Sequence, residues 1–248
     1  MLAYGLSEKG PVRDMNEDSF GYEQVGNWLC MAVADGVGGE ACGEIASQIA
    51  VDSVMDVLKD TLPFVTDKEA LPAYLKTVFN KANIKILKDC IDHRERIGMC
   101  TTLTVALLRG TELTIAHIGD TRGYLLHGSE LIKLTEDHNE TGRLLKQGQI
   151  TEEEAKVHPG RNKLFKVLGE NQYLNPDMYS YNIIYGDLVF MCSDGLYSFM
   201  SNEQFKACSQ ERNNLAGICE KLIKQALDGR SADNITVTIG KAEPATEL

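Results

Sequence analysis

The pattern of apolar positions divides the first part of the chain into three strands followed by two amphipathic helices. Strand-like runs cover residues 2–7, 19–24 and 28–34. In the first helix Ile45, Ile49 and Val57 are spaced by whole turns, and in the second the apolar positions from Leu71 to Ile86 step by three and four. Each helix carries one apolar stripe, which predicts that both pack against a sheet.

Four further strand-like segments follow in quick succession, at 101–109, 112–119, 122–127 and 130–134. The turn pairs Arg109-Gly110 and His127-Gly128 separate neighbouring segments. This pattern predicts an antiparallel meander. From 135 to 170 the chain is polar and irregular, with a capping box at Thr151 and Glu154 that predicts one short helix. We interpret residues 135–170 as a flap.

The last part of the chain returns to strands at 177–184 and 187–193, continues with two helices, and closes with a strand at 234–240. Helices thus come in pairs between runs of strands rather than one per strand, which argues against a parallel doubly wound sheet. We expect an α+β fold in a single domain over residues 1–241, followed by a frayed tail at 242–248.

Composition excludes several classes of protein. The 248 residues are 43% hydrophobic and 25% charged, as in ordinary globular proteins, and no window is apolar enough to span a membrane. The net charge of −11, without a basic stripe, argues against nucleic-acid binding. The N-terminus shows no secretion signal, and seven cysteines without a C-x-x-C pair fit reduced thiols. We therefore expect a cytoplasmic protein, and nothing in the sequence indicates more than a monomer.

Acidic residues stand at the ends of several apolar runs. Asp35, Asp120 and Asp194 each end such a run beside a glycine, and Asp233 directly precedes the last strand. Asp-Gly is a common turn dipeptide, but three strands that end alike indicate a shared site. Converging carboxylates repel one another unless cations lie between them, and Mg²⁺ or Mn²⁺ prefer oxygen ligands.

Calcium and zinc fit the sequence less well. The glycine-rich turn after Asp35 lacks the acids of a calcium-binding loop, and the five histidines lack the spacing of a zinc site. His117 lies on a predicted strand and is expected to be packed rather than ligating. A carboxylate-rich site for Mg²⁺ or Mn²⁺ remains.

The turn after Asp35 has a second interpretation. The spacing Gly36-x-Gly38-x-x-Ala41 between a strand and a helix matches a loose form of the dinucleotide-binding fingerprint. Asp35 would repel a pyrophosphate held there. The fingerprint also requires a parallel sheet, and the first acids about twenty residues further on fall inside a predicted helix. The metal-site hypothesis is therefore favoured.

Seven motifs, in order along nearly the whole chain, resemble those of the metal-dependent protein phosphatases of type 2C. They are RDMNEDSF, MAVADGVGGEACGEIAS, CTTLTVALL, AHIGDTRGYLL, LTEDHN, VFMCSDGL and SADNITVTI. The resemblance implies a four-layer αββα sandwich, with two central antiparallel sheets flanked by helix pairs and a two-metal centre in a cleft at one end. Residues 135–170 correspond to the variable flap of bacterial single-domain members, and we expect this flap to be mobile and to affect substrate access.

The resemblance also implies metal ligands. Asp35 would bridge two Mn²⁺ or Mg²⁺ ions, and the carbonyl oxygen of Gly36 would bind the second ion. Asp194 and Asp233 would complete the ligands of the first ion. Asp120, together with Asp194, matches the position of a third ion in bacterial members.

Other residues would support these ligands or the substrate. Asp18 and Glu17 would hold water molecules on the ions, and Arg13 matches the phosphate-binding arginine. Asn234 and the pair Thr101-Thr102 would shape the site. Val37 stands where eukaryotic members often carry a histidine proposed to protonate the leaving oxygen, so that proton donor has no assignment here.

The implied reaction is hydrolysis of phosphoserine and phosphothreonine monoesters on proteins, by attack of a water that bridges the two ions. The implied partners are phosphorylated proteins and a cognate eukaryotic-like serine/threonine kinase. The alternative hypothesis is a catalytically inactive, phosphatase-like module that binds phosphoproteins. Degenerate members usually lose metal-binding acids, whereas every candidate acid is present here.

Overall fold

The strands form two antiparallel sheets. The computed structural model describes residues 2–37 and 42–244. The first sheet has the order β1 (Leu2–Glu8), β11 (Ile235–Lys241), β10 (Leu188–Cys192), β7 (Arg122–His127), β8 (Glu130–Lys133). The second has the order β2 (Asp18–Val25), β3 (Trp28–Val37), β5 (Leu103–Arg109), β6 (Glu112–Ile118), β9 (Asp177–Asn182), with β4 (Cys100–Thr101) paired to β3.

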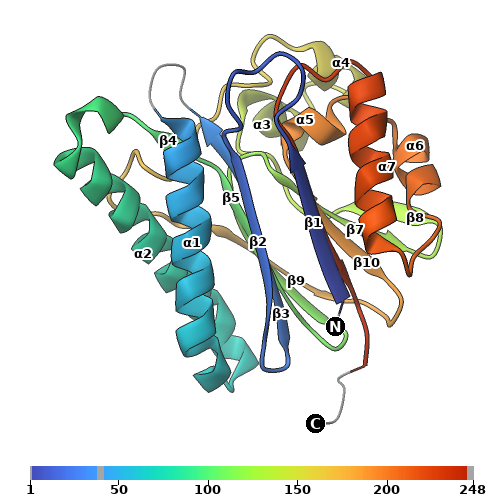
Figure 1. Ribbon diagram of the computed structural model, residues 1–248, viewed down its shortest axis with the longest axis horizontal. Coiled ribbons are helices and arrows are strands. Elements are labelled where there is room, and N and C mark those ends of the chain that lie inside the picture. The colour runs from blue at the N-terminus through green and yellow to red at the C-terminus, as the bar shows by residue number, and fades with distance from the viewer. Residues whose placement is uncertain (1, 38–41, 245–248) are drawn as a thin grey trace.

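Helices cover the outer face of each sheet. The second sheet is covered by α1 (Gly43–Thr61) and α2 (Leu71–Asp92), and the first by α5 (Asp194–Tyr197), α6 (Asn202–Cys208) and α7 (Leu215–Asp228). Short 3₁₀ helices lie at Leu62–Phe64, Lys68–Ala70 and Arg94–Arg96. Figure 1 shows α1 and α2 on one side of the sheets and α6 and α7 on the other. The predicted four-layer α+β sandwich is confirmed.

The central strands are apolar throughout because both of their faces are buried. Along β3, Cys30 and Ala32 pack toward α1 and α2, whereas Leu29 and Met31 pack into the layer between the sheets. Successive strand residues point to opposite faces, so a continuous apolar run supplies two cores at once. The same holds for β10, whose Phe190 packs toward the helices of the first sheet.

The predicted meander at 101–134 is wrong at its centre. β5 pairs with β6 and β7 pairs with β8, but β6 and β7 lie in different sheets. The chain crosses between the sheets at Gly119, Asp120 and Thr121, and Gly119 adopts a φ of +107°, which favours glycine. All strand pairs among the described residues are antiparallel, so the dinucleotide-binding hypothesis is also wrong, since it requires a parallel sheet.

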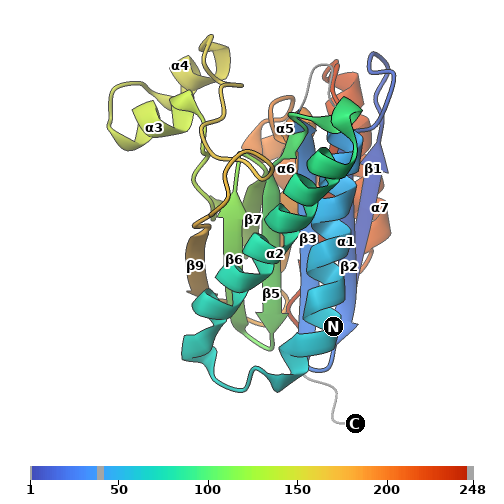
Figure 2. The ribbon, with the colours of Figure 1, turned by 90° about the vertical axis from the view of Figure 1, so that its left-hand side faces the viewer.

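Residues 135–170 contain two short helices, α3 (Glu140–Lys146) and α4 (Glu152–Val157). Figure 2 shows both helices projecting from one end of the sandwich. The predicted capping box is present at the start of α4, where Thr151 and Glu154 exchange hydrogen bonds. An isolated bridge joins Asn139 to Leu164 within the flap, and a second joins Leu168 to Thr101 of β4, so the C-terminal end of the flap contacts the body of the protein.

The C-terminal tail begins with a residue that packs against the body of the protein. Ala242, the first residue of the expected tail, is buried and donates a hydrogen bond to the carbonyl of Asp187. Residues 245–248 of that tail lie outside the described residues. Every helix in the described ranges is too short or too polar to cross a membrane.

Candidate metal centre

The acidic residues expected at the strand ends come together at one end of the sandwich. Asp18, the first residue of β2, lies directly opposite Asp35 of β3 in the strand register. Asp194 begins α5 immediately after β10, and Asp120 lies in the crossover after β6. Both sheets therefore contribute carboxylates to this cluster. Repulsion among these carboxylates helps to raise their pKa values.

We expected Asp35 to end its strand, but it lies within the strand. β3 continues to Val37, because Gly36 and Val37 pair with Thr101 and Cys100 of β4. The backbone of Asp35 is bonded on both sides by threonines: its N–H donates to Thr102 Oγ1 at 2.9 Å, and its carbonyl accepts from Thr102 N at 2.9 Å and Thr101 Oγ1 at 2.9 Å. These bonds fix the Cα of Asp35 and hence the base of its carboxylate.

Gly36 is required by close packing of backbone around it. Its N–H donates to the carbonyl of Glu17 at 3.0 Å. A Cβ at this position would collide with the carbonyl oxygens of Gly43 and Glu17. A side chain here would therefore displace β3 from α1 and from the segment before β2. Gly38 and Ala41, the other positions of the expected fingerprint, lie outside the described residues.

Asp18 is held by a serine that the sequence analysis missed. The Ser193 hydroxyl donates to Asp18 Oδ2 at 2.6 Å, and Ser193 Oγ accepts from the Thr236 N–H at 3.0 Å. Asp18 is only 8% exposed, and its other oxygen, Oδ1, finds no hydrogen-bond partner among the described residues. A buried carboxylate oxygen without a donor is costly, and a cation would satisfy it.

Burial and repulsion raise the pKa values across the cluster. Burial, followed by repulsion from Asp194 and Asp233, raises the pKa of Asp18 to about 7. Burial, followed by repulsion from Asp194, raises the pKa of Asp120 to about 7, and burial with Asp233 raises that of Asp194 to about 6. The pKa of Asp35 is raised well above its usual value by burial and by the other carboxylates of the cluster.

Arg13 lies at the rim of the cluster. Its Nη2 donates to Asp233 Oδ2 at 2.9 Å, and its side chain is 50% exposed. The loops around it are joined by Asn234, whose Oδ1 accepts from Glu17 N at 2.8 Å and whose Nδ2 donates to the carbonyls of Lys9 and Met15. Asn234 thus ties the segment before β2 to the start of β11.

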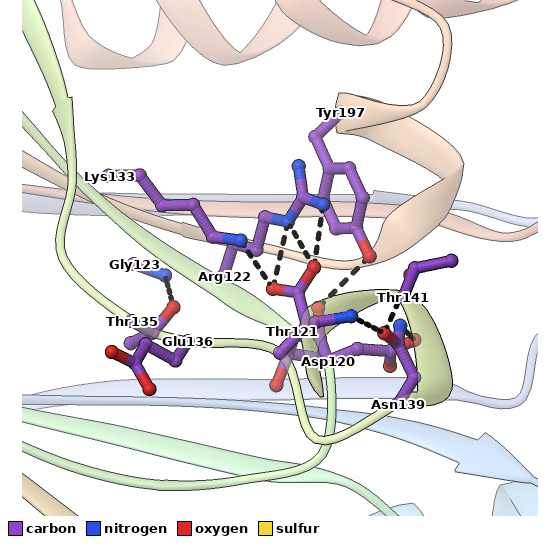
Figure 3. A network of polar contacts seen from close by, with 12 residues as sticks. Asp120, Thr121, Arg122, Gly123, Lys133, Thr135, Glu136, Asn139, Thr141 and Tyr197 are labelled. Carbon is purple, nitrogen blue, oxygen red and sulfur yellow. Dashed lines mark hydrogen bonds and ion pairs between the residues drawn. The ribbon is translucent and has the colours of Figure 1, made fainter. Parts of the chain in front are cut away.

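Asp120 lies in a polar network whose members were also missed (Figure 3). Asn139 Nδ2 donates to Asp120 Oδ2 at 3.2 Å, and the Tyr197 hydroxyl donates to the Asp120 carbonyl at 3.0 Å. Beside them Arg122 stacks on the Tyr197 ring and pairs with the buried Asp137 at 2.7 Å. The sequence signal was the motif LTEDHN, a polar segment whose Asp137 and Asn139 the fold buries.

The donor set fits a hard divalent cation. The clustered groups are carboxylates, which hard cations prefer as ligands. Burial and mutual repulsion make their ionised forms costly unless a cation lies nearby. Asp18 Oδ1 also lacks a hydrogen-bond donor among the described residues. No three His, Cys, Asp or Glu side chains in the described ranges are placed to hold one ion by themselves, and Asp233 is engaged by Arg13.

His117 is fully buried between Thr104 Oγ1 and the Glu136 carbonyl, as expected of a packed residue.

Comparisons with known sequences agree with the geometry. A family described as protein phosphatase 2C matches residues 12–228. The chain is 32% identical over 240 residues to the serine/threonine phosphatase stp of Listeria monocytogenes, covering 96% of this chain and 95% of that protein. It is 36% identical over 236 residues to the serine/threonine protein phosphatase PstP of Mycobacterium tuberculosis, covering 94% of this chain and 43% of that protein.

Solved structures show the same fold. The serine/threonine phosphatase Stp1 from Staphylococcus aureus superposes with a TM-score of 0.90 at 28% identity, over 97% of this chain and 94% of that one. The catalytic domain of PstP in complex with two manganese ions gives a TM-score of 0.82 at 33% identity, over 97% of each chain. The chain therefore belongs to the protein phosphatase 2C family.

Proposed function

We propose that the protein is a metal-dependent phosphatase that hydrolyses phosphoserine and phosphothreonine monoesters on proteins. The observation that carries this proposal is the convergence of buried carboxylates from both sheets, with an exposed arginine at their rim. Membership of the family supports it, and so do the names of the relatives, which are serine/threonine phosphatases. These names give no support to the inactive binding module.

We assign the metal ligands as the resemblance implies. Asp35, the Gly36 carbonyl, Asp194 and Asp233 would hold two Mn²⁺ or Mg²⁺ ions, and Asp120 with Asp194 would take part in a third position. Asp18 and Glu17 would contact the ions through water. When bound, such ions lower the pKa of a water molecule and neutralise phosphate oxygens. The manganese complex of PstP supports Mn²⁺ as one metal of this family.

Arg13 is suited to bind the phosphoryl group while it remains paired with Asp233. A guanidinium has five N–H donors, and the ion pair with Asp233 uses one of them. Asp233 also raises the pKa of Arg13, so its charge is retained at any physiological pH. Because the side chain is half exposed, it can reach a phosphate carried on the surface of another protein, where it would stabilise negative charge in the transition state.

The cellular setting follows from the same expectations. Substrates would be phosphorylated proteins, and the enzyme would oppose a eukaryotic-like serine/threonine kinase as a cytoplasmic monomer. The seven cysteines are all free thiols, which fits a reducing compartment.

The decisive experiment is hydrolysis of a phosphothreonine peptide by the purified protein with Mn²⁺, with Mg²⁺ and with a chelator. We expect turnover that requires metal, releases inorganic phosphate and disappears in the Asp35→Asn variant. A folded wild-type protein that shows no turnover with either metal would overturn the proposal, and binding of the phosphopeptide under those conditions would revive the inactive module.

A further inference from the structure

Asn139 occupies a position between the flap and the candidate metal centre. It is the N-cap of α3, the first flap helix, and it is 3% exposed. Its Oδ1 accepts from the Gly142 N–H at 2.9 Å and from the Thr141 hydroxyl at 2.8 Å. Its Nδ2 donates to Asp120 Oδ2 at 3.2 Å, which Figure 3 shows from close by. One amide thus serves a helix on one side and a carboxylate on the other.

The backbone donor on its oxygen fixes which way this amide faces. The Gly142 N–H can only donate, so it must face the amide oxygen, and the amide nitrogen then points toward Asp120; the Thr141 hydroxyl donates to the same oxygen. A donor to one oxygen of a carboxylate restricts its rotation and stabilises its charged form. Asp120 Oδ2 is thereby held by the flap, which leaves Oδ1 for a cation.

The base of the flap is anchored independently of this contact. Asp137, two residues before Asn139, is buried and pairs with Arg122 and Lys133, each at 2.7 Å. The other end of the flap returns to the same place, where Phe165 N donates to the His138 carbonyl and Leu164 bridges Asn139. Loss of the Asn139 amide should therefore loosen α3 without unfolding the segment.

We propose that Asn139 is a positioning residue that couples the flap to Asp120, holding the carboxylate with its nitrogen while it caps α3 with its oxygen. The coupling acts in both directions: displacement of α3 releases the carboxylate, and a fixed carboxylate holds α3 in place. The part that concerns metal binding rests on the proposed function. The contact between Asn139 and Asp120 does not depend on the proposed function, and it can be tested without metal.

The test uses a matched pair of asparagine caps. Asn214 caps α7 as Asn139 caps α3, by accepting from the N–H of a glycine three residues on, but it is exposed and belongs to another helix. Serine is about as good an N-cap as asparagine and is too short to reach Asp120. Asn139→Ser therefore removes the contact and keeps the cap, and Asn214→Ser controls for the cap alone.

The first readout is tryptic cleavage in the flap in the presence of chelator. Lys146 and Lys163 offer exposed cleavage sites, with 69% and 73% of their side chains accessible. We expect Asn139→Ser to speed flap cleavage roughly tenfold, the effect of losing one hydrogen bond to a charged group, and Asn214→Ser to leave it unchanged. Asp120→Ala should speed it similarly, and the double variant should be no faster than either single variant, since all three lack the same contact.

The second readout is the Mn²⁺ concentration that gives half-maximal turnover. It should rise several-fold in Asn139→Ser and stay at the wild-type value in Asn214→Ser. Additive effects of the two substitutions on cleavage, or equal cleavage of the two serine variants, would overturn the inference. If the wild type shows no turnover at all, the proposed function fails, and the metal-free cleavage cycle still decides the role of Asn139.

Discussion

Asp35 and Asp18 face each other across neighbouring strands, where like charges destabilise the pair. Burial and the surrounding carboxylates raise the pKa of Asp35, so ionising it in the absence of a cation costs folding free energy. This residue is therefore expected to lower stability and to support catalysis at the same time. Such a conflict at a single residue is typical of functional sites.

We predict that Asp35→Asn lowers phosphatase turnover by at least ~10²-fold. In chelator, the same substitution should raise the Tm by ~3 °C. The amide has nearly the shape of the carboxylate but carries no charge, so repulsion within the cluster decreases. Thermal denaturation with EDTA and phosphopeptide turnover with Mn²⁺ measure the two effects. Asp52→Asn, on the exposed face of α1, is the control and should change neither. A lower Tm for Asp35→Asn would contradict the repulsion argument.

Arg13 acts at the rim of the site, and its ion pair with Asp233 is half exposed. Exposed pairs contribute about 0–1 kcal/mol to stability, so Arg13→Ala should unfold at nearly the wild-type urea concentration. Its kcat/KM toward a phosphopeptide should fall roughly 10²-fold, because charge stabilisation at the phosphoryl group is lost. Arg96→Ala removes the comparable ion pair with Asp89, outside the cluster, and should retain full kcat/KM. Equal kinetics for the two variants would remove Arg13 from the site.

At the scale of elements, the junction between β10 and α5 joins the two sheets. Ser193 belongs to the first sheet by its bonds to Thr236 of β11, and its hydroxyl reaches Asp18 of the second sheet. A short hydrogen bond from a buried hydroxyl to a carboxylate is among the stronger neutral-to-charged contacts. The relative position of the two sheets at the metal end therefore depends partly on one hydroxyl.

Ser193→Ala should lower the free energy of unfolding by about 1–3 kcal/mol, since Asp18 would lose its donor and keep its buried charge. Urea denaturation at pH 8 in chelator measures this loss. The double variant with Asp18→Asn should recover part of it, because a neutral amide is less costly to leave unpaired. If Ser193→Ala is as destabilised with Asp18→Asn as without it, the bond between the sheets does not carry the effect.

The elements that periodicity predicted are largely those observed, and the failures have physical causes. Helices α1 and α2 show clear periods because each packs against a defined core. The crossover at Gly119 was read as a turn within one sheet, because a local pattern does not say which sheet a strand joins. Asn139 and Ser193 were missed because a buried polar residue and a loop residue look alike until long-range partners are known.

The whole molecule assembles its site from both sheets, at the end from which the flap projects (Figure 2). Asp35, Asp120 and Asp194 were predicted from their shared position at strand ends and Asp18 from the family resemblance. The structure brings these four residues into one electrostatic cluster. The register that places Asp18 opposite Asp35 could not be predicted from the spacing alone. Since no single element contains the site, its electrostatics should affect the stability of the entire fold.

The stability of the metal-free protein should therefore fall as the pH rises from 6.5 to 8. The folded-state pKa of Asp18 and of Asp120 is about 7, whereas an unfolded aspartate has a pKa of about 4, so the folded chain binds more protons in this range. Stability gained by protonation is lost as these two groups ionise, by about 0.8 kcal/mol each or roughly 1.5 kcal/mol together. Buried His117, with its pKa lowered to about 3, acts in the opposite direction but mainly below pH 6.5.

Urea denaturation in EDTA across this pH range measures the decline. Asp18→Asn should reduce it, because one of the titrating carboxylates of the cluster is gone. Saturating Mn²⁺ should abolish it, because a cation binds the ionised carboxylates and stabilises only the folded chain. A metal-free stability that is flat or rises between pH 6.5 and 8 would mean that these carboxylates are already neutralised by the protein itself, and the case for a cation at this end of the sandwich would fail.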